Sequence, residues 1–220
     1  MTPRVVVVVD SRMGSTLALA QAMANGAASE RAEVRLRRVG MTSPECGVDP
    51  GSKSYQACQQ VYEQLTSASV EDLRWANSIA WGCPTRYGLP TTPMHSFIDE
   101  IGPLWRSGEL IGKVGAAFTS TGGMHSGNET TLLNLLLPFL QHGMVIAGVP
   151  HSVPELTSTT KGGSPYGASA VTGFDGSRGV DGKELAIANA LGARLARLAV
   201  YSLPEPASVE TAARDGGVER

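Results

Sequence analysis

Short apolar runs alternate with amphipathic stretches along this chain. The first run, from Val5 to Val9, consists of five consecutive valines. A continuous β-branched run is typical of a strand that is covered on both faces of a parallel sheet. Residues 14–28 then place Leu17, Ala20 and Ala24 on neighbouring helical turns. The chain is therefore predicted to begin with a buried strand followed by a helix.

The same alternation continues to residue 201. The pattern predicts further strands at 32–39, 76–82, 113–120 and 144–149, and helices at 92–101, 127–141 and 181–201. Strands that alternate with helices indicate an α/β fold, in which right-handed crossovers join the strands of a parallel sheet. We expect one domain over residues 1–202 and a disordered tail over 203–220, where prolines, small residues and charges replace the periodic pattern.

Two segments interrupt this pattern. Residues 40–75 contain Pro, Gly and Ser before a helical stretch near 55–65, and residues 150–180 are rich in Gly, Ser and Thr. Irregular segments of this length inside a compact domain usually have a functional or interfacial role. We therefore expect both to contribute to a site or to an interface.

Composition and charge narrow the class of protein. The 220 residues are 42% hydrophobic and carry a net charge of −2, so no basic field indicates binding to nucleic acid or to an anionic membrane. No apolar run is long enough to span a bilayer. Cys46, Cys58 and Cys83 form no C-x-x-C pair, which favours packed thiols in a reducing, cytoplasmic compartment. The four histidines are scattered, so we expect no metal site.

The loop after the first strand is a candidate phosphate site. It contains Ser11, Met13, Gly14, Ser15 and Thr16, and it leads directly into a helix. Backbone N–H groups at a helix N-terminus attract phosphate. The loop lacks the lysine of a G-x-x-x-x-G-K-[ST] motif, which argues against an NTPase, and it lacks the G-x-G-x-x-G fingerprint of dinucleotide-binding proteins. The alternative is an ordinary helix start that is capped by Ser11 or Ser15.

Two later loops carry related signals. Residues 83–90 include Pro84, Thr85, Arg86 and Tyr87, which offer hydrogen-bond donors and a ring that can stack, although a stiff surface turn would look similar. Residues 120–127 begin with Ser120, Thr121, Gly122 and Gly123, whose backbone can approach a flat ring closely, or which simply connect a strand to a helix. In open α/β sheets, ligands bind at the carboxyl ends of the strands. We therefore expect the three loops to converge on one ligand.

Taken together, these motifs resemble the flavodoxin-fold NAD(P)H:quinone oxidoreductases of the WrbA type over about residues 4–202. The most specific matches are the stretches at 82–88 (GCPTRYG), 102–105 (GPLW) followed by 107–108 (SG), 118–122 (FTSTG), 142–146 (HGMVI), 162–168 (GGSPYGA) and 175–178 (DGSR). The resemblance implies a flavodoxin-like five-stranded parallel sheet of order 2-1-3-4-5 with helices on both faces. This sequence departs from the family at Met13, where members commonly have a tyrosine, and residues 40–60 match the family poorly.

The resemblance also implies FMN as the cofactor. The first loop would hold the phosphate, residues 84–87 would border the isoalloxazine ring, and residues 120–123 would hold its pyrimidine edge. His142 matches a family histidine at the flavin pocket, where it would hydrogen-bond or deliver a proton, and Trp105 matches an aromatic residue near the substrate. The alternatives are a histidine favoured by a helix C-terminus and a buried interface tryptophan. Arg86 would contact the flavin, and the alternative is that it forms an ion pair on the surface.

The implied activity is FMN-dependent two-electron reduction of a quinone, or another aromatic small-molecule acceptor, to the hydroquinone. NADH or NADPH would donate hydride in a ping-pong cycle, and flavin would carry the redox chemistry. Family members typically form tetramers, so we expect a homo-oligomer, either a dimer or a tetramer. Two alternatives stay open, namely a flavodoxin-like electron carrier and a flavin reductase specialised for an aromatic metabolite.

Overall fold

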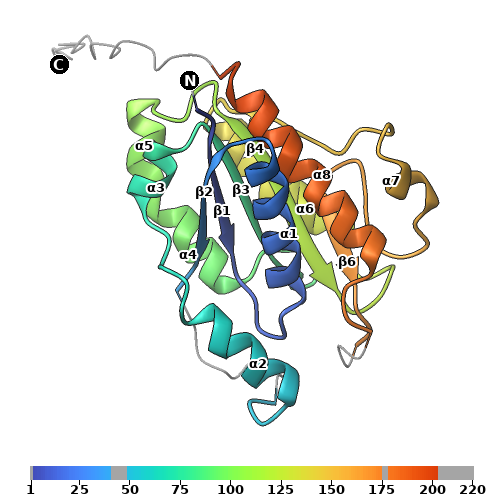
Figure 1. The fold of residues 1–220 in the computed structure, drawn as a ribbon. Helices are drawn as coiled ribbons and strands as arrows, with labels where there is room; N and C mark the ends of the chain where they lie inside the picture. Colours follow the sequence, from blue (N-terminus) through green and yellow to red (C-terminus); the bar gives the residue numbers. More distant parts are fainter. Residues whose placement is uncertain (1, 41–48, 175–177, 203–220) are drawn as a thin grey trace, which may run out of the picture.

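The chain folds into a parallel sheet between two layers of helices, in a computed structural model that describes residues 2–40, 49–174 and 178–202 (Figure 1). The strands β1 (Arg4–Val9), β2 (Glu33–Arg38), β3 (Ser78–Pro84), β4 (Val114–Thr121) and β5 (Val145–Ile146) lie in the order β2-β1-β3-β4-β5. All of these pairs are parallel. The predicted sheet order is confirmed.

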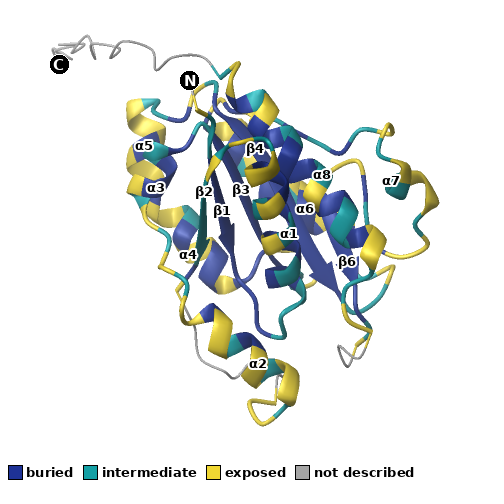
Figure 2. Cartoon of the chain, in the orientation of Figure 1, coloured by how far each residue is buried: buried dark blue, intermediate teal, exposed yellow. Residues whose placement is uncertain are grey.

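The valine run explains why both faces of the sheet are covered. Val5, Val7 and Val9 point into one core, together with apolar residues of α1 (Ser15–Ser29) and α8 (Gly182–Ala199). Val6 and Val8 point into the opposite core, because successive side chains of a strand alternate between faces. All five valines are fully buried, and the central strands are correspondingly dark in Figure 2.

The second core is covered by four helices. These are α3 (Val70–Trp75), α4 (Thr92–Glu100), α5 (Gly102–Ser107) and α6 (Asn128–Gln141). The helix α2 (Lys53–Tyr62) lies beyond the carboxyl ends of the strands, at the lower end of the sheet in Figure 1. The one-turn or two-turn helices α3, α5 and α7 (Pro154–Ser158) were not predicted, because so few residues show no helical period.

The fifth position of the sheet differs from the expectation of one strand at 144–149. It is filled by two short strands, since β5 pairs with Val114 and Gly115, whereas β6 (Ala168–Val171) pairs with residues 118–121 of the same strand β4. The intervening residues 147–167 leave the sheet and return. Glu184, which is fully buried, accepts hydrogen bonds from Gly162 N (2.7 Å) and Val171 N (2.8 Å) and so anchors the return.

Some expectations fall outside this description. Cys46 and the tail predicted at 203–220 lie outside the described residues, and the single domain over residues 1–202 stays a prediction. Within the described ranges, no helix is long and apolar enough to cross a membrane.

Candidate flavin-binding site

A pocket of about 420 Å³ opens at the carboxyl ends of β1, β3 and β4. The strand register produces it, because Val9 lies opposite Gly82 and Gly82 lies opposite Phe118, so that the loops after these strands emerge at the same edge. The three predicted loops do converge there. The residues predicted from the sequence that line the pocket are Ser11, Met13, Ser15, Thr16, Pro84, Thr85, Arg86, Ser120, Thr121 and Gly122.

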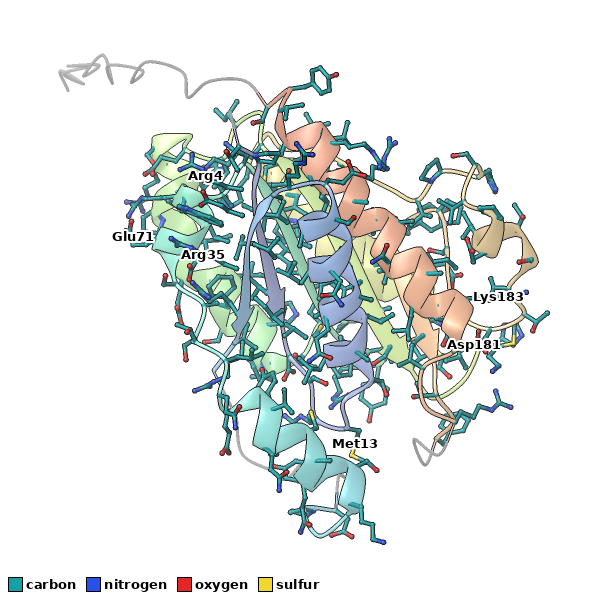
Figure 3. All side chains as sticks on the ribbon, in the orientation of Figure 1. Arg4, Met13, Arg35, Glu71, Asp181 and Lys183 are labelled. Carbon is teal, nitrogen blue, oxygen red and sulfur yellow. The ribbon has the colours of Figure 1, made fainter. Side chains whose placement is uncertain are left out.

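The first loop presents hydroxyl groups and the start of α1 to this pocket. Gly14 is the N-cap residue with φ of 94°, so no side chain at that position caps the first turn. Ser11 Oγ instead accepts a hydrogen bond from Leu17 N (3.2 Å). The Thr16 and Ser120 hydroxyl oxygens lie 2.7 Å apart, which ties the first loop to the third. Met13 lies between the start of α1 and α2 (Figure 3).

The second loop lines the pocket only in part. Thr85 Oγ1 accepts from Gly88 N (3.1 Å) and lies 2.7 Å from Thr131 Oγ1, which fixes the turn against α6. Tyr87 has a left-handed φ of 56°, is fully exposed and does not line the pocket. The structure therefore does not place Tyr87 where a stacking ring was expected. Gly14 and Gly123 are likewise absent from the lining.

Several residues of the lining were not predicted. Arg12 is buried, and its position in a hydroxyl-rich loop carried no signal of its own. Asp49 and Ser52 come from the segment before α2, which the sequence marked only as irregular. Thr172, Gly173 and Phe174 follow β6, whose short run of small residues has no clear strand pattern. Thr172 N donates to Thr121 O (3.0 Å), which joins this fourth loop to the third.

A buried carboxyl group lies directly behind the first loop. Asp10 Oδ2 accepts a hydrogen bond from Thr91 Oγ1 (2.6 Å), and Thr91 N donates to Cys83 Sγ (3.4 Å). Burial raises the pKa of Asp10, while the Thr91 hydrogen bond and the charges of Arg12 and Arg86 oppose that rise. Asp10 thus connects the end of β1 with the end of the second loop.

Trp105 and His142 lie in a different pocket, of about 590 Å³, between α4, α5 and α6. Trp105 is 58% exposed, and its Nε1 donates to Gln141 O (3.1 Å). His142 is buried, its Nδ1 has no hydrogen-bond partner among the described residues, and burial lowers its pKa. Neither residue lines the pocket at the sheet edge. The protomer alone does not bring these two residues to the predicted cofactor site.

The sheet order and a pocket at its carboxyl edge define a flavodoxin-like α/β protein. A solved WrbA-like flavodoxin from Agrobacterium tumefaciens has this fold, with a TM-score of 0.61 and 24% identity over 92% of this chain and all of that one. The family model of NADPH-dependent FMN reductases matches residues 3–154. The chain therefore belongs to the NADPH-dependent FMN reductase family.

Two curated relatives cover nearly the whole chain. The chain is 40% identical to a NAD(P)H dehydrogenase (quinone) of Sinorhizobium fredii over 198 residues, which is 89% of this chain and 96% of the relative. It has the same identity to a NAD(P)H dehydrogenase (quinone) of Rhizobium johnstonii, over 89% of this chain and 97% of the relative.

Among the described residues, no group of three or more His, Cys, Asp or Glu side chains is arranged to hold a metal ion.

Proposed function

We propose that this protein is an FMN-dependent NAD(P)H:quinone oxidoreductase. The observation that carries this proposal is the convergence of three loops, rich in hydroxyl groups and glycine, on one pocket at the carboxyl edge of a flavodoxin-like sheet. The names of the two relatives that are 40% identical support both the nucleotide donor and the quinone acceptor.

The pocket fits the two ends of FMN. Ser11, Ser15 and Thr16, with the N-terminus of α1 and the cation of Arg12, form a donor set suited to a phosphate. The residues of the other loops, namely Pro84, Thr85, Arg86, Ser120, Thr121 and Gly122, line the remainder of the pocket. Its volume of about 420 Å³ is in the range that small-molecule sites occupy.

Bound FMN supplies the two-electron redox chemistry. The residues that line the pocket would hold the reactants in a fixed orientation, and this function depends on the shape of the pocket. Backbone N–H groups of the third loop, whose residues 120–122 line the pocket, would stabilise negative charge on a ring that lay against them. Alternation of nucleotide and acceptor at one open face would make the cycle ping-pong.

We further propose that a second copy of the chain completes the site, in a dimer or a tetramer. Trp105 and His142 lie outside the FMN pocket of their own protomer and line a separate, largely apolar one. A homo-oligomer would bring these residues to the pocket of a neighbour. His142, whose pKa burial lowers, would then accept or donate a hydrogen bond at Nδ1, and Trp105 would border the acceptor.

A cytoplasmic location is proposed from the thiols. Cys58 and Cys83 are free and buried, and burial raises the pKa of the Cys83 thiol to about 12. Such thiols are packed rather than reactive, and unpaired cysteines are usual in a reducing compartment. Fractionation of cells that express the tagged protein tests this assignment.

The decisive experiment starts from the visible spectrum of the purified protein. We expect the protein to be yellow, or to take up added FMN, and we expect NADH or NADPH to bleach the flavin absorbance under anaerobic conditions. Benzoquinone should then restore the absorbance. A protein that takes up no FMN refutes the proposal. A flavoprotein that neither nucleotide bleaches would instead be an electron carrier, and one that benzoquinone does not reoxidise would act on another acceptor.

A further inference from the structure

Phe174 occupies an unusual place at the edge of the proposed FMN pocket. It follows β6 and lines the pocket together with Thr172 and Gly173. Phe174 is 91% exposed, and it is the only aromatic side chain that lines the pocket among the described residues. Single exposed apolar residues are common on protein surfaces, so exposure alone indicates no function. The contacts of this ring with the third loop carry the argument.

The Phe174 ring lies close to two glycines of the third loop, Gly122 and Gly123. A Cβ atom at Gly122 would lie 2.8 Å from Cδ1 and 3.1 Å from Cα of Phe174, and one at Gly123 would lie 3.1 Å from Cζ of the same ring. Neither glycine has a left-handed φ, so the backbone conformation itself does not require glycine there. At Gly122 the space is filled by the Phe174 ring and by the Cα atom of Phe174, whereas at Gly123 the first atom met is Ser126 Oγ, at 2.7 Å, and the ring lies just beyond it.

The geometry points to Phe174 as the aromatic platform on which the flat ring of bound FMN stacks, an inference that rests on the proposed function. The Phe174 ring lies against Gly122 and Gly123, most of its surface is exposed to solvent, and the residue lines the pocket. Offset stacking between aromatic rings is favourable beyond the burial of area. Tyr87, from which the sequence predicted this role, is fully exposed outside the lining.

The first test compares FMN with riboflavin, which has the same ring but no phosphate. In Phe174→Ala we expect the Kd of both ligands to rise by the same factor, roughly tenfold, equivalent to about 1.4 kcal/mol. In Ser15→Ala, which removes a hydroxyl group at the phosphate end, we expect the Kd to rise for FMN alone. Tyr201→Ala removes an exposed aromatic residue outside the pocket and serves as the matched control.

The outcomes separate this inference from the proposed function. If the wild-type protein binds neither ligand, the proposed function fails. If the wild type binds both and Phe174→Ala binds them equally well or more tightly, only the platform is refuted. Melting temperatures of all variants establish that each one folds, and Phe174→Trp should keep the affinity while quenching flavin fluorescence.

A second test addresses the support of the ring. Gly122→Ala places a methyl group where the Phe174 ring lies, so it should displace the ring and weaken FMN binding. The same substitution should weaken binding less in the Phe174→Ala background, because the ring it would displace is gone. An equal loss in both backgrounds contradicts the proposed contact.

Discussion

At the scale of single residues, two buried ionisable side chains stand out. Asp10 is held by the Thr91 hydroxyl group behind the first loop, and burial raises its pKa. His142 is buried with Nδ1 unpartnered among the described residues, and burial lowers its pKa. Both shifts favour the neutral form, because moving a charge out of water is costly. The two side chains therefore exchange protons at a different pH in the folded protein than in the unfolded chain.

The lowered pKa of His142 predicts a pH dependence of stability. Between the ordinary value of 6.5 and the lower folded value, the unfolded chain binds a proton at His142 and the folded chain does not. The free energy of unfolding should therefore fall as the pH falls below 6.5, by at most about 1.4 kcal/mol per pH unit from this group. Urea titrations between pH 7 and pH 5 should show a smaller fall for His142→Asn. Identical slopes for the two proteins would contradict this account.

At the scale of elements, glycines set how closely helices pack. A Cβ atom at Gly26 of α1 would lie 1.9 Å from Asn189 O of α8, and one at Gly192 of α8 would lie 2.0 Å from Met23 O of α1. The two helices therefore touch backbone to backbone over the first core, side by side in Figure 1. Any side chain at either position must push the helices apart.

We expect Gly192→Ala to destabilise the fold by roughly 1–3 kcal/mol through this overpacking. Chemical denaturation measures the change, and Gly182→Ala is the matched control in the same helix. Gly182 has no heavy atom within 4 Å of an added Cβ, so its substitution should not destabilise the fold. Equal stability of Gly192→Ala and the wild type would show that the helices relax apart freely.

At the scale of the whole molecule, the exposed leucines of α6 form a candidate interface. Leu133, Leu137 and Leu140 follow one another at helical spacing on α6 and are 46%, 54% and 57% exposed. Leu137 also lines the pocket that contains Trp105 and His142. Contiguous exposed apolar area of this kind usually marks an interface. This surface is where the proposed second copy would bind.

Leu137→Lys should therefore shift the protein toward monomer. A charge at the centre of an apolar interface is not compensated, and its burial is costly. Size-exclusion chromatography with light scattering measures the mass, and Val200→Lys, at an exposed position at the end of α8, is the control. A wild-type protein that is already monomeric at micromolar concentration would refute the interface.

Local sequence pattern was enough to predict β1 to β4, the place of β5 in the chain and the three loops at the edge of the sheet. The valine run and the hydroxyl-rich loop after it are local patterns of neighbouring residues, so they can be interpreted from the sequence alone. The family resemblance then added the sheet order and FMN. Most residues predicted at the cofactor site do line one pocket.

The tertiary structure decided what depends on contacts between distant segments. It divided the fifth position of the sheet between β5 and β6, which pair with different parts of the long strand β4. The four small residues of β6 have no strand pattern that could have predicted this pairing. It placed Phe174 rather than Tyr87 in the pocket, and it put Trp105 and His142 in another. The strand of five valines and the loop of serines and glycine after it predicted a phosphate site. Phe174 lines the same pocket as that loop although it lies about 160 positions further along the chain, because folding pairs β6 with β4.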